Sequence, residues 1–323
     1  MRFRLVQAPT GDHIAYFEPI APSNSIAVLS TVDGSERPLH DNETGYSFYP
    51  TWSPDGRHVV AFIAGSSGEA SDSALSSGEN GPADFTGYEM LSIQGYPYPY
   101  AKGLVIYDTV TQTTSVVEAE GKWIINFPTW AGNSQKLLFL AGSAIQKEDG
   151  SIETIEDSLW SVDLTAEALT ASRMMDMDEL PVGPPSACSI TSASHDGGVV
   201  YLHIFAERSR SVWAIQEGDE PLRLTDIGMG TIWKLVETHG YDIATIQQED
   251  ASKWILWAFK HEDGVVAEPL ADIVPNEGYS LSNIDVMSFR NERVFLVATM
   301  SNRETRRLYG VFVVFEDVSR LGF

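Results

Sequence analysis

The sequence has few basic residues, one cysteine and no long apolar run, and each shortage excludes a class of protein. Its 21 lysines and arginines stand against 45 aspartates and glutamates, and the formal net charge of −24 repels a phosphate backbone, so we expect no nucleic-acid partner. Cys188 is the only cysteine, so no disulfide can form within the chain, and we interpret it as a small buried apolar residue. No run of about 18 apolar residues occurs, so we expect no membrane span.

Signature motifs for catalysis and ion binding are also missing. There is no Gly-x-Ser-x-Gly elbow of a serine hydrolase, no Gly-rich phosphate loop and no Asp-x-Asp-x-Asn-Gly calcium loop. Four of the seven histidines fall in or beside the same kind of turn: His13, His58, His195 and His239. Equivalent turns belong to different repeats and lie too far apart to share one metal ion. We interpret the acidic run at 174–179 as a solvated loop, and we expect no metal and no cofactor.

The N-terminal residues 1–7 alternate polar and apolar side chains and lack the apolar core of a signal peptide. As written, the chain is expected in the cytoplasm. A leader removed before this numbering began would place it in the periplasm or outside the cell instead. We expect it to be a monomer.

Two stretches of the chain are near copies of each other. Residues 49–66 and 127–143 both begin with an aromatic residue followed by Pro-Thr-Trp, and both continue with a tight turn and an apolar strand. The turns contain Asp55-Gly56 in one copy and Asn133-Ser134 in the other, and these residue types accept the positive φ that a two-strand hairpin requires. Repetition at this scale indicates one supersecondary unit that is used several times.

Six segments of the chain follow this pattern, each with short β-branched and aromatic runs separated by Gly, Asn, Asp and Pro. Four strands in each of six units predict a six-bladed β-propeller of four-stranded antiparallel blades, because radial repetition removes long exposed sheet edges. We expect a single domain over residues 1–323 with a long loop insertion at 66–103. Residues 1–7 either close the ring beside the last unit or form the inner strand of the first; we favour the inner strand because the Gly11-Asp12 turn follows it.

The segment Trp-Ser-Pro-Asp-Gly-Arg at 52–57, followed by an apolar strand and later by Ile-Tyr-Asp at 106–108, resembles the WD40-like repeat of TolB-like propellers. The same pattern occurs in the propeller domain that precedes the hydrolase domain in dipeptidyl-peptidase-IV-type enzymes. The likeness is close in the second and third units and looser in the other four. It implies the propeller fold, which hosts binding platforms, peptidase gates and enzymes alike.

Trp52 and Trp130 occupy the same place in two repeats. Tryptophan often forms a stacking platform for a ligand, but an identical repeat position favours packing between adjacent blades. By the same argument, we interpret Asp55-Gly56 as turn chemistry and not as a catalytic acid.

The long insertion of the second unit divides into two halves of different composition. Residues 66–84 are rich in Ser, Gly and acids with no basic residue, which predicts a mobile leader. Residues 85–100 are aromatic and proline-rich, and we expect them to lie over the mouth of the channel and to anchor a partner. The alternative is a lid that adds only stability. The candidate binding residues are Phe85, Tyr88, Tyr96, Tyr98 and Tyr100.

The connections between second and third strands carry opposite charges in different units. In the third unit we expect a second loop insertion at 142–157 with five acids against one lysine. In the fourth and sixth units the matching loops are short and basic, with Arg208, Arg210, Arg303, Arg306 and Arg307. These arginines are candidate binding residues on a polar face, and ordinary solvated loops explain the pattern equally well.

Three functions from different classes remain open. We favour a non-catalytic scaffold that presents its loop face to a protein or peptide partner, because no convergent set of acid, base and nucleophile can be identified. The alternatives are a propeller enzyme of hydrolase, lyase or lactonase type with its site at the channel mouth, and a small-molecule or glycan binder that uses the tyrosines at 96, 98 and 100.

Overall fold

The computed structural model describes residues 5–20, 23–39, 46–64, 92–93, 96–97, 100–101, 103–120, 122–146, 152–181, 187–206, 209–224, 232–237, 241–247, 254–260, 266–290 and 293–315. The chain divides into two compact units, Met1–Pro184 and Pro185–Phe323, and each is described by itself. A single domain over residues 1–323 stays a prediction. Among the described residues, no helix is long and apolar enough to cross a membrane.

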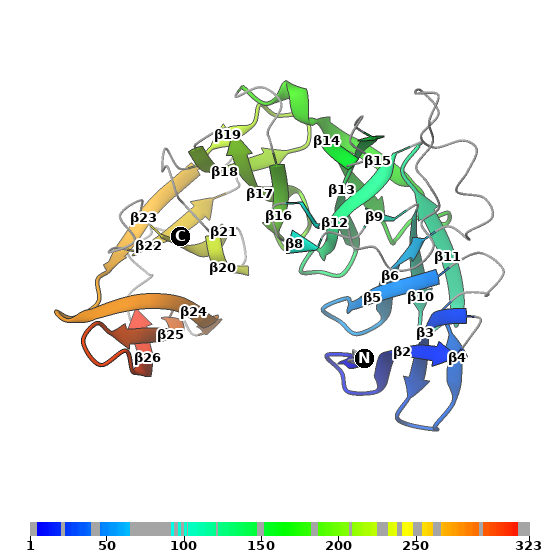
Figure 1. Cartoon of the computed structure of the whole chain (residues 1–323), viewed down its shortest axis with the longest axis horizontal. Helices are drawn as coiled ribbons and strands as arrows, with labels where there is room; N and C mark the ends of the chain where they lie inside the picture. Colours follow the sequence, from blue (N-terminus) through cyan, green and yellow to red (C-terminus); the bar gives the residue numbers. More distant parts are fainter. Residues whose placement is uncertain are drawn as a thin grey trace. The chain divides into compact units, whose positions relative to one another are not determined.

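The first unit consists of three larger antiparallel sheets that follow one another along the chain (Figure 1), and of the two-stranded pair β7 (Ser92–Ile93) and β8 (Tyr96–Pro97). The first sheet has the order β1 (Leu5–Gln7), β2 (His13–Ile20), β3 (Ser23–Ser30), β4 (Glu36–Pro38). The second contains β5 (Tyr46–Trp52), β6 (His58–Ala64), β10 (Gly103–Asp108) and β11 (Thr113–Glu118). The third contains β9 (Tyr100–Ala101), β12 (Trp123–Trp130), β13 (Lys136–Gln146), β14 (Ile152–Asp163) and β15 (Ala171–Asp176), and a single turn of 3-10 helix (Met177–Glu179) follows it.

The second unit also consists of three antiparallel sheets in chain order. The fourth sheet contains β16 (Ala187–Ala193), β17 (Val199–Ala206), β18 (Ser209–Gln216) and β19 (Leu222–Arg223). The fifth contains β20 (Ile232–Glu237), β21 (Tyr241–Gln247), β22 (Trp254–Lys260) and β23 (Val266–Ile273). The sixth has three strands among the described residues: β24 (Tyr279–Arg290), β25 (Arg293–Asn302) and β26 (Leu308–Phe315).

The role favoured for the N-terminal strand is confirmed where the structure describes it. Leu5 to Gln7 of β1 pair antiparallel with Ile14 to Tyr16 of β2, at the edge of the first sheet. The alternative role, beside the last unit, is therefore wrong for these three residues.

The turns that join first and second strands repeat one hydrogen-bonding scheme. In the second sheet the Ser53 N–H donates to the His58 carbonyl at 2.8 Å, and the Ser53 hydroxyl donates to Asp55 at 2.5 Å. The fourth sheet has the same two bonds between Ser194 and Val199 at 2.8 Å, and between Ser194 and Asp196 at 2.7 Å. Positive φ values of 72° at Gly56 and 64° at Ser134 confirm the predicted turn type. The assignment of Asp55 to turn chemistry is therefore confirmed.

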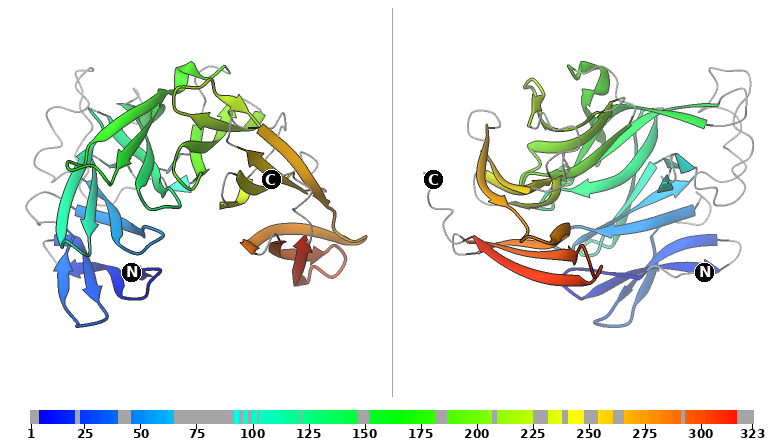
Figure 2. Two further views of the ribbon diagram at one scale, coloured as in Figure 1. Left: turned by 180° about the vertical axis from the view of Figure 1, so that it is seen from behind. Right: turned by 60° about the vertical axis from the view of Figure 1, so that its left-hand side comes forward.

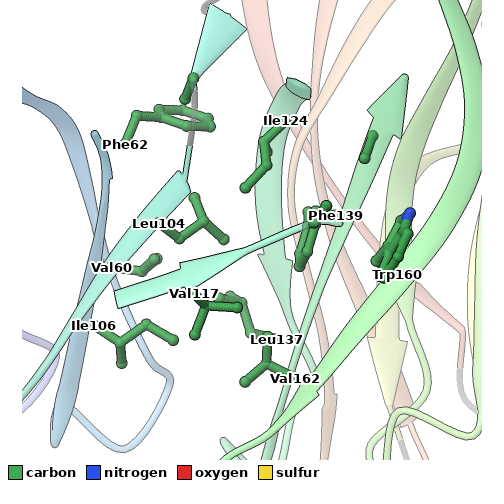
Figure 3. Close-up of a cluster of buried hydrophobic side chains, with 13 residues drawn as sticks. Val60, Phe62, Leu104, Ile106, Val117, Ile124, Leu137, Phe139, Trp160 and Val162 are labelled. Carbon is green, nitrogen blue, oxygen red and sulfur yellow. The ribbon is translucent and has the colours of Figure 1, made fainter. Parts of the chain in front are cut away.

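The middle strands of the second sheet are buried on both faces. Val59, Ala61 and Ile63 pack toward the first sheet in one core cluster. Val60 and Phe62 of the same strand point the other way and pack against Leu137 and Phe139 of the third sheet (Figure 3). This explains why the strand reads as a continuous apolar run and not as an alternating one, since both sets of side chains leave water.

Trp52 and Trp130 both lie where one sheet packs on the next, as the repeat predicted. Trp52 is 7% exposed, belongs to the core shared by the first two sheets and donates its Nε1–H to the Val6 carbonyl at 2.8 Å. Trp130 is half-buried against the core between the second and third sheets and stacks on His58 with ring centroids 6.3 Å apart.

Replacing Trp52 by alanine should therefore destabilise the protein by about 3–5 kcal/mol, because it leaves a cavity between two sheets and removes a hydrogen bond. The urea midpoint followed by circular dichroism measures the effect, and Val32→Ala at an exposed turn serves as the control. A Trp52→Ala protein that unfolds at the parental midpoint would show that the packing assignment is wrong.

Candidate functional site

The structure describes some of the predicted site residues and not others. Phe85, Tyr88, Tyr98 and Arg208 lie outside the described residues. The backbones of Tyr96, Tyr100 and Arg210 are placed in β8 (Tyr96–Pro97), β9 and β18. Only Arg303, Arg306 and Arg307 have described side chains, and all three are exposed. These three arginines are therefore the predicted binding residues whose surroundings the structure describes.

The three arginines lie on the hairpin that joins β25 to β26, and local backbone bonds hold it in shape. The Asn302 N–H donates to the Arg307 carbonyl, and the Arg306 N–H donates to the Asn302 carbonyl, both at 2.9 Å. The Asn302 side-chain oxygen accepts from the backbone N–H groups of Glu304 at 3.0 Å and Thr305 at 2.8 Å. Arg306 adopts a φ of 53°, a left-handed conformation that closes the turn.

A neighbouring turn supports this hairpin. The Arg303 N–H donates to the Gly278 carbonyl at 2.9 Å, which ties the hairpin to the turn that leads into β24. Tyr279 at the start of β24 contacts Tyr309 of β26 edge to face, with ring centroids 5.8 Å apart and an interplanar angle of 72°. The backbone is thus fixed while the guanidinium groups extend into solvent.

Exposed apolar side chains follow the arginines directly. Leu308 is 68% exposed and Tyr309 is 41% exposed, both at the start of β26. Within the described part of the chain, no ion pair involves Arg303, Arg306 or Arg307. We call residues 302–309 the arginine hairpin. It combines cationic donors, which suit carboxylate or phosphate groups, with an aromatic anchor, and both are held by a rigid support.

Sequence reasoning found the arginines of this surface but missed Leu308 and Tyr309. Both open the apolar run at 308–315, which reads as a strand. The signal that identifies them is position: the first residues of a strand directly after a basic hairpin are the least covered.

The aromatic half of the insertion is attached to the third sheet at its described end. Tyr100 and Ala101 of β9 pair with Ile125 and Ile124 of β12, at the edge of the sheet (Figure 1). Ala101 is fully buried in the core between the second and third sheets. The two-residue strands β7 (Ser92–Ile93) and β8 pair with each other just before this point. The insertion therefore ends at an inter-sheet junction before the chain returns to β10.

Phe127 stands beside this attachment and was not singled out from the sequence. It lies two residues beyond Ile125 on β12, is 45% exposed and contacts Phe62 with ring centroids 6.0 Å apart. Phe127 is thus an exposed aromatic ring close to the point where β9 pairs with β12.

The loop insertion predicted at 142–157 is wrong in its secondary structure. Residues Gly142 to Gln146 of β13 pair with Glu156 to Ile152 of β14, so the two strands continue as a long hairpin (Figure 2). The reason is the β-branched residues at 145, 152, 154 and 155, which favour extended backbone and pack well in a strand. Only residues 147–151 between them lie outside the description.

A polar cluster lies at the turn end of the second and third sheets in the first unit. Arg57 forms a forked ion pair with Asp108, in which its Nε lies 3.2 Å from both carboxylate oxygens and its Nη2 lies 2.6 Å from Oδ2. His58 Nε2 lies 3.7 Å from the same carboxylate. The Asp55 N–H donates to the Ser134 hydroxyl at 3.0 Å, which links the turns of the two sheets.

Asp108 accepts several hydrogen bonds, whereas the buried Nδ1 atom of His58 has no hydrogen-bond partner among the described residues. Burial alone raises the pKa of Asp108, but hydrogen bonds from Arg57 and from the Val110 and Thr111 backbones outweigh it and lower the pKa to about 2. Burial lowers the pKa of His58, and the Asp108 charge opposes this only in part. The Asp108 carboxylate and the buried His58 imidazole lie at the turn end of the second sheet, where the Asp55–Ser134 bond links this sheet to the third.

Comparisons with known proteins show the fold alone. No family profile matches the sequence, and no curated protein does. A solved structure from a study of two prolyl endopeptidases matches with a TM-score of 0.50 and 13% identity, over 96% of this chain and 41% of that one. The propeller domain of the trilobed protease from Pyrococcus furiosus matches at 0.47 and 13%, over 97% and 80% of the two chains. TolB from Acinetobacter baumannii matches at 0.38 and 12%, over 97% and 65%.

The chain thus spans less than two thirds of the TolB structure and less than half of the prolyl endopeptidase. The predicted likeness to TolB and to peptidase propeller domains is confirmed as a likeness of fold, together with an all-β architecture of mostly four-stranded antiparallel sheets.

The ion pair leads to a pH prediction. Because the folded pKa of Asp108 is about 2 and its ordinary value is 3.8, the carboxylate stabilises the folded state above about pH 3.8, and this contribution is lost as the pH falls toward 2. Asp108→Asn should lower the urea midpoint at neutral pH and flatten its decline between pH 4 and pH 2. Glu118→Gln, an exposed change in the same sheet, should leave the decline intact. Equal slopes for Asp108→Asn and the parent would contradict the assignment.

Proposed function

We propose that the chain forms one six-bladed propeller over residues 1–323 and acts as a non-catalytic scaffold that binds a protein or peptide partner through the connections between second and third strands. The observation that carries this proposal is the arginine hairpin. Its three guanidinium groups are exposed, none takes part in an ion pair in the described part of the chain, and Leu308 and Tyr309 lie next to them. Arginine and tyrosine are the residue types enriched at protein interfaces.

The position of the hairpin also supports a binding role. Connections between strands vary without disturbing the core, whereas the turns between first and second strands carry the Ser–Asp bonds and the inter-sheet contacts. Arg208 and Arg210 fall at the matching connection of the fourth sheet, between β17 and β18. The same surface proposal therefore covers both basic connections of the second unit.

An enzyme at the channel mouth and a glycan binder remain the alternatives. The enzyme needs a free acid and a free base, and Asp108 is held by Arg57 through a forked ion pair. The glycan binder needs the tyrosines at 96, 98 and 100 to form a stacking platform. The scaffold is favoured because the arginine hairpin already combines charge with an aromatic anchor.

A random peptide library selected on the immobilised full chain tests the scaffold. Enriched peptides should bind the parent protein and bind at least about tenfold more weakly to a triple variant, Arg303→Ser, Arg306→Asn and Arg307→Ser, which loses three charges. Asparagine is chosen at 306 because it tolerates the positive φ there. Arg293→Ser removes an exposed charge at the other end of β25 and should bind as the parent does.

Two results would overturn the scaffold. One is that no peptide is enriched above the background of the bare matrix. The other is that enriched peptides bind the parent and the triple variant equally while both variants retain the parental thermal midpoint.

A second experiment examines the aromatic insertion. Replacing Phe85, Tyr88, Tyr96 and Tyr98 by serine, with the β9 strand left intact, should weaken the selected peptides severalfold without changing the thermal midpoint, because rigid aromatic side chains anchor a partner at low entropic cost. If the midpoint falls and the affinity for the peptides is unchanged, the insertion is a stabilising lid and no part of the binding surface.

A further inference from the structure

The sixth sheet differs from the other five at its outer edge. In the described residues, each of the first five sheets continues beyond its third strand with a fourth, but the sixth has the order β24-β25-β26 and ends at β26. The N–H and C=O groups on the far side of β26 therefore have no strand partner among the residues that the structure describes. Such an edge is a template for pairing with another extended segment.

The exposed part of this edge lies beside the arginine hairpin. Leu308, Tyr309 and Gly310 are all exposed at the beginning of β26, and Val311 is half-buried. A Cβ built on Gly310 would meet no atom of the described residues within 4 Å, so the face of the strand is uncovered at this point.

The beginning of the third strand is left open in some of the sheets that do have a fourth strand, whereas in the second and fifth sheets β11 and β23 pair with the third strand from its first residue. In the first sheet β4 covers Ala27 to Leu29 of β3, and in the fourth sheet β19 covers only Trp213 and Ala214 of β18. Both short strands pair with the half of the third strand that is nearer the turn joining it to the fourth. The stretch from Leu308 to Val311 corresponds to the half that such strands leave uncovered.

We propose that this edge binds an extended acidic peptide segment as an added β-strand along Leu308 to Val311, with carboxylates of the peptide on Arg303, Arg306 and Arg307. The inference rests on the proposed scaffold function and names the chemistry of its partner. Main-chain hydrogen bonds to an open edge supply affinity without regard to sequence, and flanking side chains supply the choice of partner.

Charge complementarity favours an acidic peptide as the partner. The hairpin carries three arginines against Glu304, with Glu277 on the adjoining turn, so it is locally positive in a chain whose net charge is −24. Forked hydrogen bonds match the planar guanidinium to carboxylates. Tyr309, held by Tyr279, offers an aromatic contact to an apolar residue of the segment. A nucleic acid would meet the same arginines, but the acidic remainder of the surface would repel its long phosphate backbone.

A structural explanation competes with this one. Natural proteins place charged side chains on open sheet edges to prevent edge-to-edge aggregation, and three arginines at the start of β26 would serve that purpose without any ligand. The two explanations differ in what the parent protein does with an added peptide. A protective edge does not bind an added peptide strand, whereas a docking edge binds one that carries the complementary charge.

Fluorescence anisotropy with labelled synthetic peptides and the full chain tests the inference. The probe is a ten-residue peptide in which glutamate alternates with valine and tyrosine. It should bind the parent and weaken as salt is raised above physiological ionic strength. The double variant Arg306→Asn/Arg307→Ser should bind about tenfold or more weakly. Arg293→Ser should bind as the parent does, and all variants should keep the parental thermal midpoint.

Three changes of the probe test whether the peptide binds as an added strand and whether its acidic side chains are required. The peptide with N-methyl groups on alternate residues should lose binding, because one edge of its backbone can no longer donate. The peptide with lysine in place of glutamate should not bind, and a DNA oligonucleotide should not compete. If the N-methylated peptide binds equally, no strand is added; if the lysine peptide binds equally or the DNA competes, the acidic peptide is the wrong class.

Two further outcomes would also overturn the inference. Binding of the acidic probe only to a variant that ends at Phe315 would mean that residues 316–323 of the same chain occupy the edge. Binding of library-selected peptides without binding of the acidic probe would overturn this inference alone and leave the scaffold standing. Failure of both the library and the probe would instead overturn the scaffold as well.

Discussion

Burial of both faces of a sheet is the constraint on which each unit of this protein depends. The second sheet packs through Val59 and Ala61 on one face and through Val60 and Phe62 on the other. In the second unit the fifth sheet does the same, with Trp254 and Leu256 toward the sixth sheet and Phe259 toward the fourth. A sheet of this kind cannot leave its neighbours without exposing two apolar faces, so adjacent sheets stabilise one another.

This constraint decides where function can reside. Apolar side chains occupy the strands, and Ser–Asp bonds, the Arg57–Asp108 ion pair and the link from Asp55 to Ser134 occupy the turns at one end of the first unit's sheets. Changes there would disturb contacts between sheets. The connections between second and third strands are where charge, length and aromatic content vary along the sequence, although the end of the one in the second sheet also pairs with the third sheet through β9.

The sequence allowed good prediction of what is local and poor prediction of what depends on distant neighbours. The Gly56 and Ser134 turns, the packed tryptophans and the exposure of Arg303, Arg306 and Arg307 follow from short motifs and from repeat position. The pairing of β9 with β12 cannot be predicted from any local pattern in the two segments. Residues 142–146 pair with residues 152–156 as strands because the segment carries β-branched residues at 145, 152, 154 and 155, and its acidic composition led instead to the prediction of a loop. The open edge of β26 is a property of the whole sheet and could not be read from its strand alone.

A cluster of arginines in a chain with a net charge of −24 acts over a limited distance, and this limits how it can recognise a partner. At physiological ionic strength the screening length is about 8 Å, so a carboxylate beside the arginine hairpin interacts mainly with the hairpin and not with the acidic remainder. At about 0.01 M salt the screening length grows to about 30 Å, and the whole negative surface then repels an acidic partner before it arrives. Added salt weakens the local attraction, which lowers the affinity for the partner. It also weakens the long-range repulsion, which raises that affinity. A partner held by the hairpin alone would bind best at intermediate ionic strength, which distinguishes such a site from the surface of a uniformly basic protein.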